Sequence, residues 1–152
     1  MAFLSSMNIV ASGMTAQQLR LDIVGENVTN STTTPVEEGE GAYRRKMVVF
    51  EAETGRDGFR RAMARASSGM VPNNQVPGGV RVAQIVEDTS PMKLVYDPTH
   101  PDANEDGYVE MPNVDMVKEI ADAMAASQAY AANVTMLNTM KTVVTDGLQI
   151  GK

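Results

Sequence analysis

Residues 114–150 read VDMVKEIADAMAASQAYAANVTMLNTMKTVVTDGLQI, and this stretch decides the fold because apolar residues recur in it at alternating spacings of three and four. Seven of the nine positions in that series are apolar, namely Ile120, Ala123, Tyr130, Val134, Leu137, Val144 and Leu148. Such spacing predicts one long helix that buries an apolar stripe against other helices. We expect the helix to begin after Asn113, which can cap it, with Asp115 in the first turn, where the helix dipole favours an acid, and to end near residue 150.

The N-terminal residues repeat this pattern. Six of eight positions at the same spacing are apolar, namely Leu4, Met7, Ala11, Met14, Leu21 and Val28. No proline interrupts residues 3–28, which predicts a second helix there. At a rise of about 1.5 Å per residue, the C-terminal helix would exceed it by about 18 Å. The thirteen apolar residues of these two stripes are the candidate assembly interface. Because one chain cannot cover both stripes, we expect both ends to be poorly ordered before assembly.

The middle of the chain is predicted to be rich in strands. Alternating apolar residues favour strands at residues 44–52, 80–86, 93–96 and 107–111. Residues 59–66 fit a short helix or a strand equally well. The predicted fold is therefore α+β. Residues 1–30 and 112–152 would form a coiled-coil-like inner domain, and residues 31–111 a small β-rich outer domain.

Composition excludes several function classes. A net charge of −6 argues against non-specific binding of nucleic acid. The absence of cysteine excludes disulfides, thiolate metal sites and a cysteine nucleophile. We find no secretory signal pattern and no bilayer-spanning run, so we expect a cytoplasmic protein or one exported without a cleaved signal. The basic triplet Arg44-Arg45-Lys46 is interpreted as solvated charge at a strand end, or as a contact for an acidic partner.

Candidate chemical sites are few. Residues 102–107 (DANEDG) match the first half of an EF-hand calcium loop, but the twelfth position is Asn113 instead of glutamate. We favour an Asx-rich turn before a strand, and a calcium-binding protein using residues 102–107 stays open as an alternative. His100 lies between Pro98 and Pro101 and is interpreted as a turn residue whose side chain is not needed to set the turn. No nucleotide-binding or catalytic-triad spacing is present, so we expect no enzyme, no cofactor and no metal.

Several segments carry a resemblance to a known family. Three stretches near the N-terminus resemble a motif shared by bacterial flagellar axial proteins, namely residues 11–18 (ASGMTAQQ), 20–23 (RLDI) and 27–30 (NVTN). The axial proteins are the rod, hook and related subunits. Further stretches narrow the resemblance to the proximal rod proteins, at residues 43–51 (YRRKMVVFE), 95–103 (VYDPTHPDA), 107–114 and 127–133.

The resemblance implies a mechanical function without an active site. In such proteins the terminal helices stack into a tube around an export channel, a β-rich domain lies outside, and the rod transmits torque. Subunits travel unfolded through the flagellar type III export apparatus, without a cleaved signal, to the periplasmic rod of the basal body. The implied partners are copies of itself, other proximal and distal rod subunits, the rod–ring adaptor, the export apparatus and, during assembly, the rod cap. Nucleic acid and direct membrane insertion are not implied. Another flagellar axial subunit is the alternative.

Overall fold

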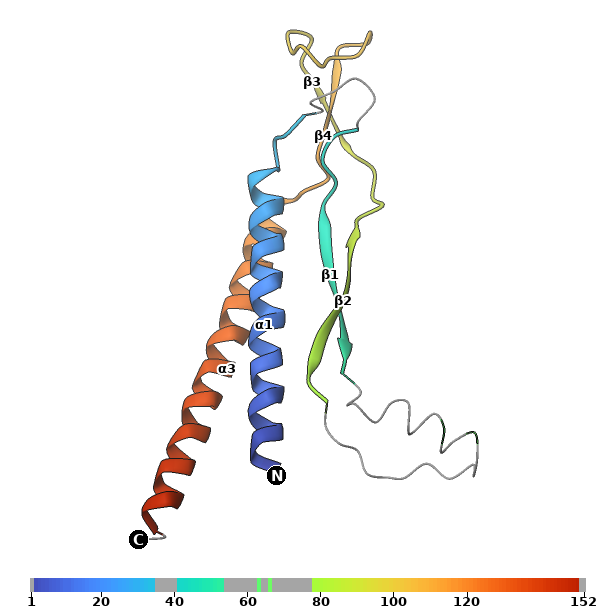
Figure 1. Cartoon of the computed structure of the whole chain (residues 1–152). Coiled ribbons are helices and arrows are strands. Elements are labelled where there is room, and N and C mark those ends of the chain that lie inside the picture. Colours follow the sequence, from blue (N-terminus) through green and yellow to red (C-terminus); the bar gives the residue numbers. More distant parts are fainter. Residues whose placement is uncertain (1, 35–40, 54–62, 64–65, 67–77, 151–152) are drawn as a thin grey trace. The chain divides into compact units, whose positions relative to one another are not determined.

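The computed structural model describes residues 2–34, 41–53, 63, 66 and 78–150 of the chain (Figure 1). Within these residues it contains two long helices and four short strands. In chain order they are α1 (Ala2–Thr29), β1 (Lys46–Ala52), β2 (Val80–Glu87), β3 (Lys93–Tyr96), β4 (Tyr108–Met111) and α3 (Met116–Ile150). The predicted α+β class is therefore confirmed. The predicted strands are confirmed to within two residues at each end. Residues 59–66 lie outside the described part of the chain, apart from Met63 and Ala66.

Both helices lie where the apolar spacing predicts them. α1 has 28 residues and α3 has 35, so at about 1.5 Å per residue they differ in length by about 10 Å, less than the 18 Å expected. The start of α3 also differs from the prediction. Asp115 caps the helix, because its Oδ1 accepts the N–H of Val117 at 3.1 Å. The expectation that Asn113 is the cap is therefore wrong, and its side chain has a different role described below.

β1 and β2 form a two-stranded sheet. Just beyond one end of the pair, the N–H of Glu53 donates to the carbonyl of Gly79 at 2.7 Å. Just beyond the other end, the N–H of Asp88 donates to the carbonyl of Arg45 at 2.8 Å. These bonds join the end of each strand to the start of the other, so the pair is antiparallel.

β3 and β4 form a separate antiparallel hairpin. In its register Val95 lies opposite Val109, and Tyr96 lies opposite Tyr108. Val109 is fully buried, whereas Tyr96 and Tyr108 on the other face are exposed. The pleat thus places Val95 and Val109 on one face and the two tyrosines on the other, and on the first face Val109 is buried whereas Val95 is 43% exposed. Gly107, with a φ of 80°, supplies the left-handed residue directly before β4.

The chain divides into two compact units. Unit 1 contains Met1–Gln17, Phe50–Ala83 and Ala129–Lys152, and unit 2 contains Gln18–Val49 and Gln84–Gln128. Each unit includes a segment of α1 beside a segment of α3. Most buried apolar side chains belong to unit 2, namely Ile23, Val24, Ala42, Val109, Val114 and Ala126. Among the described residues of unit 1, the buried apolar side chains are Val10 and Ala16.

Candidate assembly interface and its supporting polar cluster

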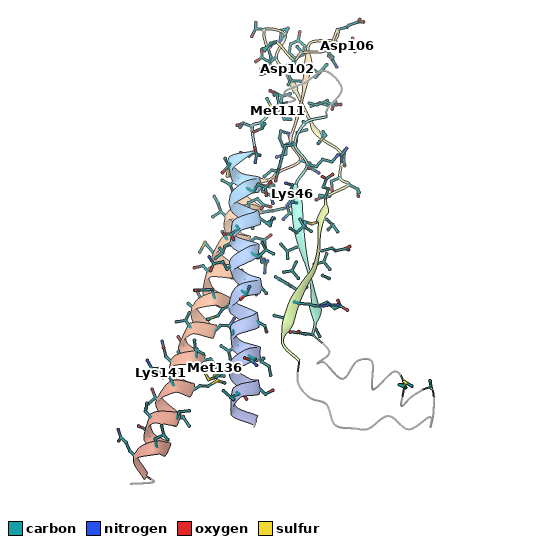
Figure 2. All side chains as sticks on the ribbon, viewed as in Figure 1. Lys46, Asp102, Asp106, Met111, Met136 and Lys141 are labelled. Atoms are coloured by element: carbon teal, nitrogen blue, oxygen red, sulfur yellow. The ribbon has the colours of Figure 1, made fainter. Side chains whose placement is uncertain are left out.

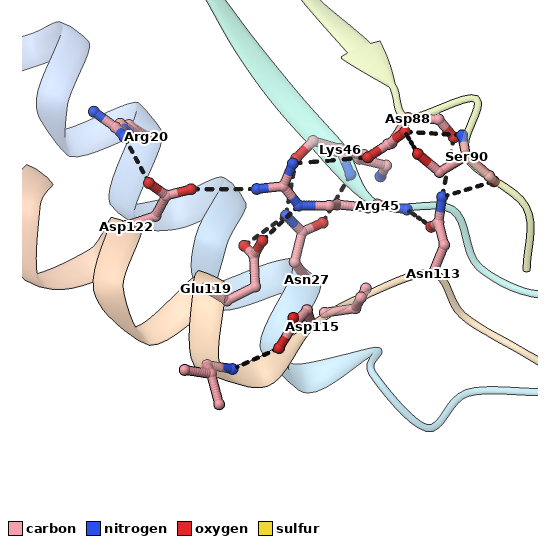
Figure 3. Close-up of polar contacts among 12 residues, drawn as sticks. Arg20, Asn27, Arg45, Lys46, Asp88, Ser90, Asn113, Asp115, Glu119 and Asp122 are labelled. Atoms are coloured by element: carbon pink, nitrogen blue, oxygen red, sulfur yellow. Dashed lines mark hydrogen bonds and ion pairs between the residues drawn. The ribbon is translucent and has the colours of Figure 1, made fainter. Parts of the chain in front are cut away.

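Asn27, on the last turn of α1, fixes the start of β1 against the helix (Figure 3). Its side chain is 1% exposed, yet every hydrogen-bonding position of the amide is used. The Nδ2 donates to the carbonyl of Lys46 at 2.8 Å and to Oε2 of Glu119 at 3.0 Å. The Oδ1 accepts the N–H of Lys46 at 2.9 Å and the hydroxyl of Tyr43 at 2.9 Å. The amide thus pairs with Lys46 as a neighbouring strand would.

Arg45 binds two carboxylates of α3, and one of them, Glu119, also accepts a hydrogen bond from Asn27. Its Nε donates to Oε1 of Glu119 at 2.6 Å, and its Nη2 donates to Oδ2 of Asp122 at 3.2 Å. Asp122 also accepts from Nη2 of Arg20 on α1 at 3.0 Å. Glu119 is 0% exposed, so its charge needs such partners to be tolerated. We call Arg20, Asn27, Arg45, Glu119 and Asp122 the polar cluster; it joins α1, α3 and the start of β1 within unit 2.

The interpretation of the basic triplet Arg44-Arg45-Lys46 as solvated charge is therefore wrong for Arg45 and Lys46, which form ion pairs within the chain. The side chain of Arg45 is only 17% exposed, and its acidic partners are in the same chain. Lys46 forms an ion pair with Glu26, and the hydrogen bond to that carboxylate raises the pKa of Lys46. Burial, together with the nearby charge of Glu26, raises the pKa of the Tyr43 hydroxyl. Arg44 is exposed, and for this residue the prediction is confirmed.

Asn113, just before α3, forms hydrogen bonds to two other segments of the chain. Its Oδ1 accepts the N–H of Arg45 at 2.8 Å. Its Nδ2 donates to the carbonyls of Asp88 at 3.1 Å and Ser90 at 3.2 Å. The side chain therefore connects the segments that flank both sheets, and the helix cap falls to Asp115.

The thirteen predicted interface residues are all partly or fully accessible in the single chain. Leu4, Ala11, Ile120 and Leu148 are exposed, and the half-buried ones are Met7, Met14, Leu21, Val28, Ala123, Tyr130, Val134, Leu137 and Val144. Among the side chains that α1 buries, Ala16, Ile23 and Asn27 lie away from the predicted stripe, whereas Val10 and Val24 lie beside it. Packing within the chain therefore leaves the predicted stripe of α1 available for other contacts.

Sequence reasoning missed part of the accessible apolar surface of α3. Val117, Met124, Met136 and Val143 are 76%, 69%, 51% and 62% exposed. The signal was present, because Val117 and Met124 are seven residues apart, as are Met136 and Val143, which places each pair on one helix face. The polar cluster was missed as well. No local sequence pattern indicates it, because Asn27 and Glu119 are 92 positions apart in the chain.

The loop between β3 and β4 is built from local hydrogen bonds. The Oδ1 of Asn104 accepts the N–H of Asp106 at 3.1 Å and that of Tyr108 at 2.8 Å, which confirms the predicted Asx-rich turn. The hydroxyl and the N–H of Thr99 both donate to Asp97 and hold the pKa of that carboxyl below its ordinary value. Across the described ranges, no three His, Asp or Glu side chains are grouped so that they could hold a metal ion.

His100 contributes to this loop through its ring. The Nδ1 accepts the N–H of Asp102 at 3.2 Å and lies 3.6 Å from Oδ2 of the same residue. The ring thus adds a bond to a turn that also contains backbone bonds from the N–H of His100 to Asp97 and from the N–H of Ala103 to His100, and it stays a prediction that the turn forms without the side chain. Its interpretation as a turn residue stands.

The chain is similar to known flagellar proteins. A family model described as "Flagellar basal body rod FlgEFG protein C-terminal" matches residues 105–150, which include β4 and all of α3. The flagellar basal-body rod protein FlgC of Bacillus subtilis (strain 168) is 41% identical over 150 residues, or 97% of both chains. Its counterpart in Borreliella burgdorferi is 38% identical over 99% of this chain and 98% of the relative. The FlgC of Salmonella typhimurium is 38% identical over the full length of both.

The chain belongs to the FlgC family of flagellar basal-body rod proteins. As a FlgC-family protein it is a structural subunit located in the basal-body rod, where it assembles with other flagellar components. Its relatives are named as rod proteins and not as enzymes. No helix in the described part of this FlgC-family chain combines the length and the hydropathy needed to cross a membrane.

Proposed function

We propose that this chain is a proximal rod subunit that polymerises through α1 and α3 into the inner tube of the rod. The observation that carries the proposal is the apolar surface that both helices leave accessible. On α3, large apolar side chains that are at least half exposed occur along the whole helix, namely Val117, Ile120, Met124, Met136, Val143 and Leu148. Apolar surface of this extent favours association with other helices.

Close packing of α1 and α3 supports the coiled-coil-like arrangement of the inner domain. In unit 1, a Cβ built on Gly13 would lie 3.0 Å from Nδ2 of Asn133, so even an alanine at position 13 would require the Asn133 side chain to shift. In unit 2, Arg20 reaches Asp122 across the same pair of helices. In the assembled rod, residues 1–30 and 112–152 would form the inner domain and residues 31–111 the outer one.

The partners follow from this arrangement. Copies of the chain and other proximal rod subunits would cover the remaining apolar surface of both helices. The distal rod, the rod–ring adaptor and the rod cap would meet the growing rod at its ends. Unfolded export through the flagellar type III apparatus is compatible with a chain that contains no cysteine and therefore no disulfide to reduce. The tube would enclose the export channel and transmit torque along its axis.

Two substitutions in the predicted stripes test the role of the helices. Leu21→Asp and Val134→Asp each place a charge in an apolar helix contact, which costs several kcal/mol when the charge is buried without a partner. We expect loss of motility and of rod-containing basal bodies in a strain that carries either variant as its only copy. Hydrogen exchange should show that the β3–β4 hairpin stays folded.

The matched controls are Thr15→Asp and Thr135→Asp, which add the same charge at exposed positions outside the predicted stripes of the same helices. These variants should assemble rods. Normal rods with Leu21→Asp or Val134→Asp would contradict the proposal. Basal bodies would be counted by electron microscopy, with the cellular level of each variant measured in parallel.

A further inference from the structure

The outer face of the β3–β4 hairpin is apolar and aromatic, and the described residues of the chain leave it exposed. Leu94, Tyr96 and Tyr108 are 62%, 65% and 43% exposed. The register places Tyr96 opposite Tyr108 and Leu94 opposite Glu110, so these four residues share one face. Two of the four tyrosines of the chain thus lie together in solvent. Tyrosine-rich apolar patches of this kind are typical of protein interfaces. We call these four residues the hairpin face.

The two rings of the hairpin face are held in place before any partner binds. Tyr96 and Tyr108 pack edge to face, with ring centroids 5.2 Å apart and an angle of 65° between the planes. Tyr96 also packs over Gly107, where an added Cβ would lie 3.0 Å from the ring atom Cε2. Rings that are already ordered lose little conformational entropy on binding, which favours their use as anchors.

The charge around the hairpin face indicates the kind of partner that fits it. Residues 93–111 contain a single lysine and five carboxylates, namely Asp97, Asp102, Glu105, Asp106 and Glu110. Figure 2 shows Asp102 and Asp106 on the loop that joins β3 and β4. The ammonium of Lys93 is bonded to the carbonyl of Val114. A partner surface that complements the hairpin face would therefore combine an apolar recess with a cation that has no acidic neighbour of its own.

Unit 1 of the same chain offers such a surface. A groove of about 380 Å³ is lined by Met7, Leu137, Asn138, Lys141, Val144 and Thr145. In proteins generally, an apolar cavity of about 150 Å³ is large enough to bind benzene. The larger groove of this chain therefore has room for a tyrosine ring. Lys141, labelled on α3 in Figure 2, is exposed on its rim. The nearest acid along the helix, Asp146, lies about 140° around the helix axis from Lys141, and α1 has no charged residue before Arg20.

We propose that the hairpin face of one copy docks into this groove of a second copy. Tyr96 and Leu94 would enter the groove, and Glu110 would lie beside Lys141. The inference rests on the proposed function, because Met7, Leu137 and Val144 belong to the predicted stripes. It adds a contact between two different surfaces of the chain. Such a heterologous contact extends from copy to copy instead of closing a two-fold dimer, as a tubular assembly requires.

Site-directed cross-linking tests the docking directly, because the natural chain contains no cysteine. Asn138→Cys in the groove and Leu94→Cys on the hairpin face would be produced as two differently tagged copies in one strain. After basal bodies are isolated, a short thiol-specific cross-linker should give a dimer that carries both tags. The control replaces Leu94→Cys with Glu53→Cys, an exposed position outside both surfaces, and should give no dimer.

Charge reversal tests the same contact without cysteine. Lys141→Glu and Glu110→Lys each place like charges together, and each should lower the number of complete basal bodies about tenfold. Combining both changes in one chain restores opposite charges at every contact and should restore assembly. Glu53→Lys is the matched control and should behave as the natural chain.

The outcomes separate this inference from the proposed function. Absence of the mixed dimer, linkage of either thiol to a different protein, or failure of the double reversal to restore assembly would overturn the docking. If Leu21→Asp still blocks assembly in that case, the proposed function stands alone. If the mixed dimer forms although Leu21→Asp rods assemble normally, the docking stands, and the part of the α1 stripe near Leu21 takes no part in assembly.

Discussion

At the scale of single residues, the polar cluster shows what sequence patterns leave out. Asn27 and Glu119 are 92 positions apart in the chain, and each looks like an ordinary polar residue of an amphipathic helix. Apolar periodicity identifies the faces that bury hydrophobic side chains. It does not indicate that a helix buries an amide and a carboxylate that satisfy each other. The cluster therefore became visible only with the tertiary structure.

Arg45 is expected to be irreplaceable by lysine. Its Nε and Nη2 reach Glu119 and Asp122 at the same time, which a single ammonium group cannot do with the same geometry. Arg45→Lys should lower the free energy of unfolding by about 2 kcal/mol, the typical contribution of a hydrogen bond to a charged group. Chemical denaturation of the purified chain measures this.

Arg44→Lys is the matched control, because Arg44 is adjacent but exposed. It should change the free energy of unfolding by less than about 0.5 kcal/mol, as is usual for surface substitutions. Equal effects of the two substitutions would show that the geometry of Arg45 contributes nothing particular.

Two short turns should each carry an aspartate with a lowered pKa. Thr99 donates twice to Asp97, and Ser90 donates twice to Asp88, which in each case stabilises the charged form. Because the folded pKa lies below the unfolded one, the stabilisation is present above the unfolded value of about 3.9. It is lost as the pH falls through the folded pKa.

Removing one hydroxyl should raise one pKa only. Thr99→Ala should raise the pKa of Asp97 toward its ordinary value, while the remaining N–H bond keeps part of the shift. Ser90→Ala should do the same for Asp88 and leave Asp97 unchanged. Carboxyl titration by NMR measures both. A pKa of Asp97 that stays the same in Thr99→Ala would mean that another group causes the shift.

At the scale of the elements, apolar spacing and turn residues predicted both helices and all four described strands to within a few residues. These signals are local, so they could be read from the sequence. The cap of α3 was misassigned because Asn113 and Asp115 both have side chains suited to an N-cap. Only tertiary contacts decide between them, since Asn113 bonds to Arg45, Asp88 and Ser90.

The face of each helix that is buried was harder to predict than the helix itself. α1 has apolar residues on more than one face, and it buries Val10 and Ile23 while the stripe with Met14 and Leu21 remains partly accessible. Periodicity alone does not distinguish a stripe that packs within the chain from one that serves assembly, because both need the same spacing.

Asp115→Ala should destabilise the start of α3. The substitution removes the side chain that accepts the N–H of Val117, and loss of a cap costs about 1 kcal/mol. Asp115→Asn keeps an acceptor at the same position and should cost much less. Thermal unfolding followed by circular dichroism compares the three proteins. Similar losses in both variants would assign the effect to charge instead of capping.

At the scale of the whole molecule, the two units contain unequal amounts of buried side chain. Unit 2 holds the polar cluster and most of the buried apolar residues, whereas the described part of unit 1 buries only Val10 and Ala16 among its apolar side chains. Of the described α3 side chains in unit 1, all are half-buried or exposed. A segment with few buried contacts opens more readily than one held by many. The same helices should therefore differ in stability along their length.

Hydrogen exchange on the monomer should reveal this difference. The sequence alone predicts weak protection throughout residues 1–30 and 114–152. The polar cluster restricts that expectation, because Arg20 and Asn27 on α1 bond to Asp122 and Glu119 on α3. Residues 18–29 and 119–128 should then exchange more slowly than residues 2–17 and 129–149. A substitution that breaks the cluster, such as Arg45→Lys, should reduce the difference.

Assembly into rods should change the pattern of hydrogen-exchange protection along α1 and α3. In isolated rods, neighbouring copies would cover the accessible faces of α1 and α3, so residues 2–17 and 129–149 should gain the most protection. Uniform protection along α3 in the monomer would mean that unit 1 is as stable as unit 2 despite its small core. Unchanged exchange of residues 129–149 in the rod would mean that this part of the helix takes no part in the contacts between subunits.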